Sequence, residues 1–212
     1  MINILAVYDD NDAELAEYFD NSHQYICDCF PDNPNINLQS LNGLSCHQVE
    51  IAGRIATFAN QPFIFIGISH GKEGCLHTSN HQIVDMANIT QFTNSFFYTA
   101  ACKTAITLGQ QLIDNGCLAY IGFKNNVGVI DMEEYHEIFI ECENHGIIEF
   151  LNSNKTIEIV YNEMIEVFTK HYEKLLLGNG LDKLVAIDLL DNRLALERKG
   201  NANLTREHFI IN

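Results

Sequence analysis

The chain has 212 residues and a mass of 24.0 kDa, a length that suits one medium-sized domain. Hydrophobic residues make up 47% of it and charged residues 19%, a balance that excludes a disordered chain. Because 12 basic residues stand against 28 acidic ones, the formal charge is −16, and we expect neither nucleic acid nor an anionic membrane surface as a direct partner.

The amino-terminal half predicts strands that alternate with helices. Residues 2–8 form an almost continuous apolar run, typical of a strand buried on both faces. Asp12 is the expected N-cap of a helix that ends near Asn21 and Ser22. We then expect a weaker strand at 24–30, a loop rich in Asn and Pro, a helix over 45–60 with a capping box of Ser45 and Gln48, and a central strand at 63–68.

The remaining elements continue this alternation. A small hairpin is predicted at 74–85, a short helical or irregular piece at 85–92, strands at 96–101 and 117–123, and helices at 105–116, 133–150 and 156–177. Residues 184–190 and 193–197 resemble a hairpin joined at Asp191 and Asn192, although the first half also permits a helix. The order predicts an α/β fold, a mostly parallel sheet with helices on both faces. We expect a single domain over 1–212, with a core at 1–150 and a helical and hairpin extension at 151–212.

Cysteine usage and the first residues suggest a compartment. The seven cysteines are an odd number, which does not suit a fully disulfide-bonded scaffold. The chain shows no signal peptide, and no apolar stretch approaches the roughly 20 residues that span a bilayer. We therefore expect a cytoplasmic protein with reduced thiols.

Two reactive residues follow two of the strongest predicted strands. His70 comes after the strand at 63–68 and Cys102 after the strand at 96–101. If these strands are neighbours, about 4.8 Å separates their backbones and the two side chains can face each other. Cys102 is expected at the start of the next helix, where the helix terminus and Lys103 favour the thiolate. The N–H groups of Gly71 and Cys102 could together hold an oxyanion.

These two motifs resemble a known family. The apolar strand before His70-Gly71 and the one ending in Ala101-Cys102 are similar to the matching segments of caspase-fold (clan CD) cysteine peptidases, most of all CHAT and gingipain-like members. The resemblance is good over about residues 60–125 and does not extend to the last 60. It implies a peptide hydrolase with His70 as acid and base, Cys102 as nucleophile and Gly71 as an oxyanion donor.

The resemblance leaves the substrate open. Clostripain and metacaspases carry an acid two residues before the cysteine, where this chain has Ala100. The P1 residue of a substrate is the one that precedes the scissile bond. In this family a second position that recognises the P1 side chain lies just after the first strand, where this chain has Asp9 and Asp10. Those acids suggest a basic P1 residue, whereas Lys103 suits an acidic or neutral one.

Several residues have a simpler structural interpretation. Asp9 and Asp10 could instead cap the first helix or bind a cation, although a response-regulator receiver is excluded because it needs an aspartate where Ser69 and His70 stand. His77 and His81, with Cys75 nearby, lack the spacing of a zinc site, so we expect no metal and no cofactor. The acids between residues 133 and 143 are expected on a solvated helix face: Glu133, Glu134, Glu137, Glu141 and Glu143.

Together these observations predict a cysteine endopeptidase that cleaves protein or peptide substrates through a thioester. The alternative is an inactive member of the same fold that serves as a protein-binding adaptor. The segment from Lys124 to Asp131 is a candidate activation loop, because Asn125, Asn126 and Gly128 favour flexibility, and Lys124 is a candidate self-cleavage site. A separate regulatory or recruiting protein is the expected partner.

Overall fold

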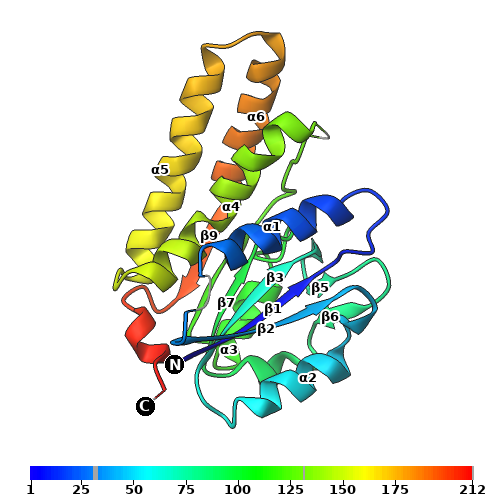
Figure 1. The fold of residues 1–212 in the computed structure, drawn as a ribbon, viewed down its shortest axis with the longest axis vertical. Helices are drawn as coiled ribbons and strands as arrows, with labels where there is room; N and C mark the ends of the chain where they lie inside the picture. Colours follow the sequence, from blue (N-terminus) through cyan, green and yellow to red (C-terminus); the bar gives the residue numbers. More distant parts are fainter. Residues whose placement is uncertain (31–32, 131, 212) are drawn as a thin grey trace.

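A computed structural model describes residues 1–30, 33–130 and 132–211, and over these ranges six strands form one sheet in the order β2-β1-β3-β7-β8-β9 (Figure 1). The strands are β1 (Ile2–Tyr8), β2 (Ile36–Asn42), β3 (Phe63–Ile68), β7 (Ser95–Thr99), β8 (Ala119–Phe123) and β9 (Leu196–Gly200). All neighbours pair in parallel except β9, which is antiparallel to β8. The predicted α/β class with a mostly parallel sheet is confirmed.

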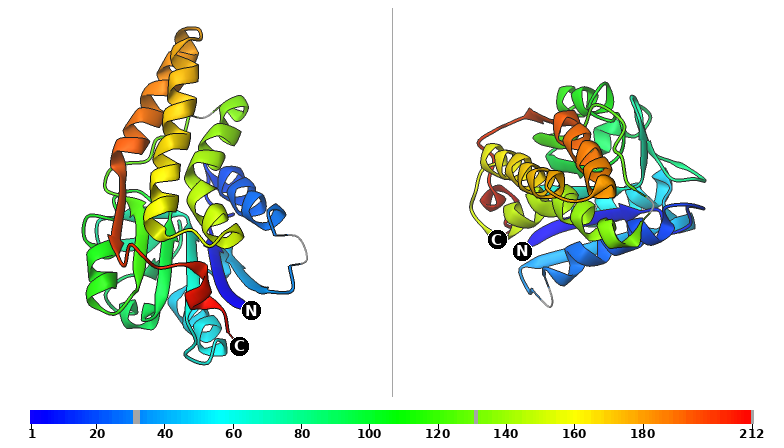
Figure 2. Two further views of the ribbon diagram at one scale, coloured as in Figure 1. Left: turned by 90° about the vertical axis from the view of Figure 1, so that its left-hand side faces the viewer. Right: turned by 90° about the horizontal axis from the view of Figure 1, so that it is seen from above.

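Helices cover both faces of this sheet (Figure 2). They are α1 (Ala16–Asp28), α2 (Gln48–Thr57), α3 (Leu108–Asp114), α4 (Glu133–Asn152), α5 (Ile157–Leu176) and α6 (Gly180–Ala195), with 3-10 turns at Gly43–Ser45, Ile89–Phe92 and Arg206–Phe209. One core contains residues of α1, α4, α5 and α6, and the other contains residues of α2 and α3. In β3, Ile64 and Ile66 point into the first core and Phe63 and Phe65 into the second, as expected for a strand buried on both faces.

A second, three-stranded antiparallel sheet follows β3 directly. It consists of β4 (His70–Lys72), β5 (Cys75–His77) and β6 (Gln82–Val84), in that order. Leu76, Ile83 and Val84 are buried in the α2 and α3 core. The predicted hairpin is confirmed, and it lies beside the end of β3, where His70 emerges.

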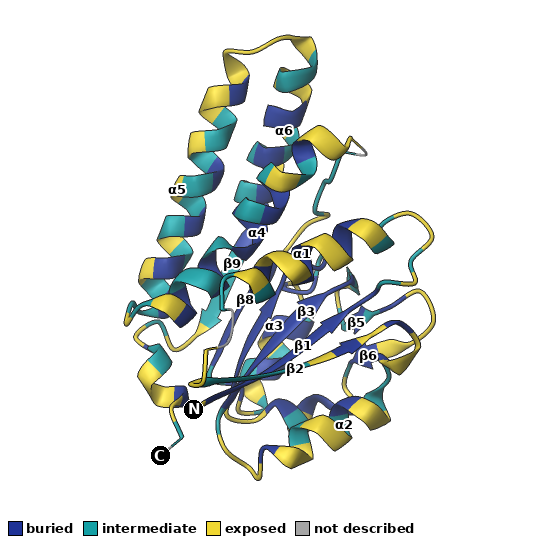
Figure 3. Ribbon diagram, viewed as in Figure 1, coloured by how far each residue is buried: buried dark blue, intermediate teal, exposed yellow. Residues whose placement is uncertain are grey.

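Three segments differ from the sequence prediction. The expected strand at 24–30 is wrong, because α1 continues through Asp28 with Ser22 and Ile26 on its buried face. The second strand is instead β2, within the expected loop, at the edge of the sheet. The first arm of the predicted carboxy-terminal hairpin belongs to α6, where Val185 and Leu189 are buried at helical spacing, and the second arm enters β9 (Figure 3).

The two ends of the chain lie side by side. The amino group of Met1 donates to the carbonyl of Ile211 at 2.9 Å. Since β1 begins at Ile2, both ends lie at the amino edge of the parallel strands. In the described part of the chain, no helix combines the length and the apolar character needed to cross a bilayer.

Candidate active site

His70 emerges at the carboxyl end of β3 and begins β4. Its side chain is 33% exposed. The ring of Phe19 meets it edge-on, with centroids 5.4 Å apart, and the ring of His77 stacks beside it at 5.8 Å. The imidazole is thus held by aromatic neighbours on two sides while it stays accessible.

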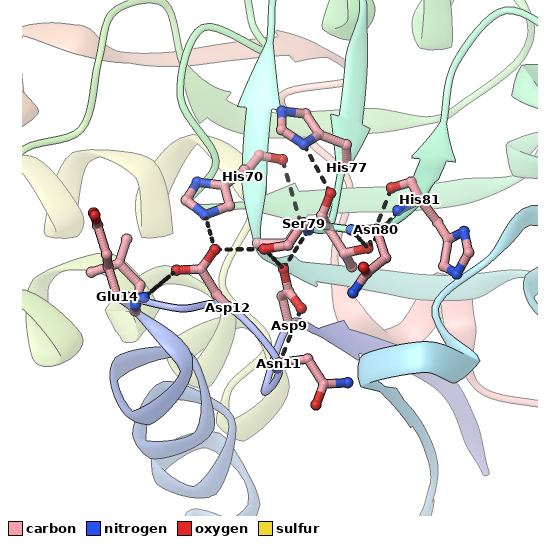
Figure 4. A network of polar contacts seen from close by, with 12 residues as sticks. Asp9, Asn11, Asp12, Glu14, His70, His77, Ser79, Asn80 and His81 are labelled. Atoms are coloured by element: carbon pink, nitrogen blue, oxygen red, sulfur yellow. Dashed lines mark hydrogen bonds and ion pairs between the residues drawn. The ribbon is translucent and has the colours of Figure 1, made fainter.

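A carboxylate fixes the orientation of this imidazole (Figure 4). His70 Nε2 lies 2.8 Å from Asp12 Oδ2, which also accepts a hydrogen bond from Ser79 Oγ at 2.6 Å. Asp12 Oδ1 accepts from the backbone N–H groups of Glu14 and Leu15 at 3.0 and 2.8 Å. Burial alone would raise the pKa of Asp12, but these hydrogen bonds outweigh it and hold the pKa well below its usual range.

Asp12 therefore carries a negative charge at neutral pH and accepts a hydrogen bond from the N–H at Nε2 of His70. In the neutral imidazole this leaves Nδ1 as the free basic nitrogen. The sequence prediction used Asp12 only as a helix N-cap. It does bond the backbone ahead of α1, but the helix begins at Ala16, and the second carboxylate oxygen is free to reach His70.

The acids predicted to bind substrate have other contacts. Asp9 is fully buried, and its Oδ2 accepts from the backbone N–H of Ser79 at 2.7 Å and lies 3.1 Å from the Ser79 hydroxyl oxygen. Asp10 accepts from Asn42 Nδ2 at 2.5 Å. Asp9 thus holds the β5–β6 turn, which in turn places Ser79 against Asp12. Their positions give no support to a substrate-binding role for Asp9 and Asp10.

Cys102 follows β7 in a tightly bonded loop. Lys103 takes a left-handed φ of 59°, and its N–H donates to the carbonyl of Asn125 at 3.0 Å. The N–H of Ala105 donates to Phe123 at 3.0 Å, so this loop and the one after β8 are joined. The following helix, α3, begins only at Leu108. The expected effect of a helix terminus on the thiol is therefore wrong.

Gly71 brings the His70 and Cys102 segments into contact. A Cβ atom at Gly71 would lie 2.5 Å from the carbonyl oxygen of Cys102 and 2.8 Å from Ala101 Cβ. No side chain fits there, so the glycine allows the two backbones to touch. His70 and Cys102 consequently line the same small cavity, of about 40 Å³.

Other elements complete this cavity. Ala100, two residues before the thiol, belongs to its wall, and Val127 and Val129 cover it from the loop after β8. In the described chain, Asp9, Asp10 and Lys103 are not among its lining residues. The site thus joins the ends of β3 and β7 with the beginning of α1, one buried face of α4 and residues 127–129.

The residue that α4 contributes is Glu143, which the sequence prediction placed on a solvated face. Glu143 is 2% exposed and its Oε2 accepts from the Tyr18 hydroxyl at 2.8 Å. Burial raises its pKa to about 8. The apolar spacing of α4 is the signal that could have found it, because Phe139 and Ile147 are one helical turn away on either side and both are buried.

Residues 124–130 lie directly against the thiol. The N–H of Val127 points at Cys102 Sγ, with 3.2 Å between nitrogen and sulfur. The next residue, Gly128, is held at both polar atoms, since its N–H donates to Asn192 Oδ1 and its carbonyl accepts from Asn192 Nδ2, each at 2.8 Å. Asn192 is a fully buried residue of α6. Asp131, the last residue of the predicted activation loop, lies outside the described ranges.

Comparison with known proteins identifies the fold. No protein-family model and no curated protein sequence matches the chain. Gingipain R, described as an Arg-specific cysteine proteinase, shares 14% identity and a TM-score of 0.66 over 96% of this chain and 47% of its own. A secreted C11 cysteine protease of Bacteroides thetaiotaomicron was solved with an irreversible peptide inhibitor. It shares 12% identity and a TM-score of 0.52 with this chain, over 80% of this chain and 59% of its own. The chain spans less than two thirds of either protein and has the caspase-like fold of clan CD peptidases.

Replacing Glu143 by Gln is expected to change how stability depends on pH. The pKa of Glu143 is about 8 in the folded chain against an ordinary value of 4.5, so folding retains a proton that unfolding releases. Between these values the free energy of unfolding falls as pH rises, by up to about 1.4 kcal/mol per pH unit. Glu143→Gln removes this loss, which urea unfolding at a series of pH values measures.

Glu137→Gln is the matched control, because Glu137 is an exposed residue of the same helix. This variant should keep the pH dependence of the parent chain. A stability difference between the parent and Glu143→Gln that stays constant with pH would contradict the raised pKa.

Proposed function

We propose that this protein is a cysteine peptidase that hydrolyses peptide bonds with Cys102 as nucleophile and His70 as acid and base. One observation carries the proposal: His70 and Cys102 line one cavity, and Asp12 holds Nε2 of the imidazole at 2.8 Å. The fold shared with two cysteine proteases supports it.

In the proposed reaction, the Cys102 thiol gives its proton to His70 Nδ1 and the sulfur attacks the peptide carbonyl carbon. The C–N bond then breaks, the imidazolium returns the proton to the leaving amine, and a thioester joins the substrate to Cys102. His70 next takes a proton from water, whose oxygen attacks the thioester and releases the acid and the thiol. Asp12 stabilises the imidazolium at each stage and keeps the ring in one orientation.

The backbone around Gly71 suits the charge that develops on the substrate oxygen. We assign the N–H groups of Gly71 and Cys102 as oxyanion donors, because the two segments touch at this glycine. Ala100 belongs to the substrate pocket as part of its wall. Lys103 follows the nucleophile with a strained backbone, and we assign it to the flank of the cleft.

Regulation of this activity is proposed for residues 124–130. Val127 contacts the nucleophile, and Asn192 clamps Gly128, so the segment limits access to Cys102 as it stands. Lys124, the predicted self-cleavage site, is tied as well, since its N–H donates to the carbonyl of Ala195 at 2.8 Å and its ammonium lies 3.5 Å from Glu197. Release of this segment by a partner protein or by processing would open the site.

The small size of the cavity also favours a second candidate function. A volume of about 40 Å³ is too small for most side chains, as expected for an inactive adaptor that keeps the fold. The two functions differ in the reactivity of Cys102 toward a peptide electrophile.

Cys102→Ala and His70→Ala are expected to lower peptidase kcat/KM by at least about 1000-fold, because each removes a group that exchanges protons or bonds with the substrate. Cleavage of a peptide library, followed by mass spectrometry, measures this.

A peptidyl acyloxymethyl ketone should label Cys102. Burial raises the pKa of Cys117 to about 11, so that thiol does not compete.

Cys75→Ala is the control, since Cys75 is a partly exposed thiol of β5. It should leave both cleavage and labelling unchanged. Cleavage that survives Cys102→Ala would overturn the assignment of the nucleophile, and an unlabelled Cys102 with no cleavage would favour the adaptor.

Asp12→Asn is expected to lower kcat by about 100-fold with little change in KM, because Asp12 orients His70 without touching substrate. Steady-state kinetics on one peptide separates the two constants. Asp10→Asn, which alters only the contact with Asn42, is the control. An unchanged kcat in Asp12→Asn would show that His70 needs no carboxylate.

Asn192→Ala is expected to increase the rate at which iodoacetamide alkylates Cys102, by about tenfold or more, since two hydrogen bonds to Gly128 are lost. Peptidase activity should rise in parallel. Intact-mass kinetics of alkylation measures the first effect. Asn203→Ala, at an exposed position, should behave as the parent. Equal alkylation rates in all three proteins would exclude a restraining role for residues 124–130.

A further inference from the structure

Glu143 lines the cavity that His70 and Cys102 share, and one of its carboxyl oxygens has no partner among the described residues. Tyr18 donates to Oε2, whereas Oε1 is buried and has no hydrogen-bond partner within the described ranges. Buried polar atoms in folded proteins are nearly always hydrogen-bonded, so this exception beside reactive groups marks a position where a hydrogen-bond donor or a cation would be favourable. The Tyr18 bond keeps the carboxyl group in place for such a group.

The rest of the cavity is mainly apolar. Phe19, Ile68, Val127 and Val129 are among its walls. Such walls accept the methylene groups of a long side chain, and their low polarity strengthens the attraction between a carboxylate and a cation. The carboxyl group of Glu143 therefore marks the place in this cavity where a positive charge is most favourable.

We propose that this cavity is the P1 pocket and that Glu143 selects a lysine or arginine side chain there. The proposal rests on the peptidase function proposed above. Cys102 Sγ attacks the carbonyl carbon of the P1 residue, so the P1 side chain enters the space that begins at this sulfur. Glu143 thus takes the role that the sequence prediction gave to Asp9 and Asp10, whose carboxylates bond Ser79 and Asn42.

The groups around Glu143 determine how this pocket responds to pH. Tyr18 comes from α1, the Tyr98 hydroxyl of β7 donates to the backbone carbonyl of Glu143, and the Cys142 thiol adjoins it. His70 and Cys102 complete the set around the cavity, and none of these groups is a permanent cation. With the pKa of Glu143 at about 8, a basic side chain must displace a proton below that pH. Binding of a basic P1 residue therefore improves as pH rises toward about 8.

The pocket must widen to accept its ligand. Its volume of about 40 Å³ holds only a few water molecules, since one water needs roughly 10–15 Å³ of such space, and a lysine side chain needs more. Val127 and Val129 are the lining residues that come from the loop after β8. Their withdrawal both uncovers Cys102 and lengthens the pocket toward Glu143, so opening and substrate selection are one event.

The test compares peptides that differ only at P1, with arginine, lysine, glutamine or norleucine there, cleaved by the parent chain, Glu143→Gln and Glu137→Gln. Glu143→Gln should lower kcat/KM for the two basic peptides by about 100-fold and leave the norleucine peptide within about threefold, because only the charge pair is lost. Glu137→Gln should match the parent. For basic peptides, kcat/KM of the parent should rise with pH up to about 8, and this rise should be absent in Glu143→Gln.

A second readout needs no catalysis. Butylguanidinium, which mimics an arginine side chain, should raise the melting temperature of Cys102→Ala at pH 8 and should fail to raise that of the double variant Cys102→Ala/Glu143→Gln. The urea unfolding series on Glu143→Gln tests independently whether this variant folds.

The outcomes separate the two proposals. Cleavage by the parent chain with no preference for basic P1 residues, or a preference that Glu143→Gln retains, overturns the role of Glu143 and leaves the peptidase function standing. Absence of cleavage by every protein, including Asn192→Ala, in which residues 124–130 are released, rejects the peptidase function instead. In that case Glu143-dependent binding of butylguanidinium supports a cation pocket at this place, and no binding overturns it.

Discussion

Parallel pairing of β1, β3 and β7 is the constraint on which the candidate site depends. Tyr8 pairs with Ile68, and Gly67 pairs with Thr99, so the three strands end at one edge of the sheet. The segments that leave this edge carry Asp12, His70 and Cys102. Because strands lie about 4.8 Å apart, their ends bring together residues that are distant in sequence. A shift of one residue in this register would turn alternate side chains to the opposite face and separate the polar groups.

The sequence predicts elements well where burial is strong on both faces. The runs that form β1, β3 and β7 are almost wholly apolar, and nothing competes with the strand interpretation. The edge strand β2 was missed because its residues are only half-buried and include Asn37 and Gln39. In α6, the apolar run at 184–190 favoured a strand, and the helix is recognised only by its buried positions at Val185, Leu189 and Asn192. Short apolar runs are ambiguous in this way unless their period is counted.

The residues of the candidate site also differ in how far the sequence predicts them. His70 and Cys102 are recognisable because each follows a strong strand and has a small neighbour. Asp12 and Glu143 are not, since their roles depend on contacts across 58 and 125 residues of sequence, to His70 and Tyr18. From the neighbouring sequence alone, Asp12 is explained as a helix cap and Glu143 as a surface charge. Only the packing of α1 and α4 over the end of β3 shows that one carboxylate orients the imidazole and that the other faces the cavity beside it.

The position of the chain ends has a practical consequence. Met1 and Ile211 meet at the amino edge of the sheet, whereas His70 and Cys102 lie at the carboxyl edge. An affinity tag, a fluorescent protein or a surface anchor joined to either end would therefore extend away from the cleft and leave it accessible. The same proximity suits a short peptide linker between Met1 and Ile211, with new termini opened at an exposed turn elsewhere. The fold thus offers a scaffold in which attachment and the candidate chemistry occupy opposite sides of one sheet.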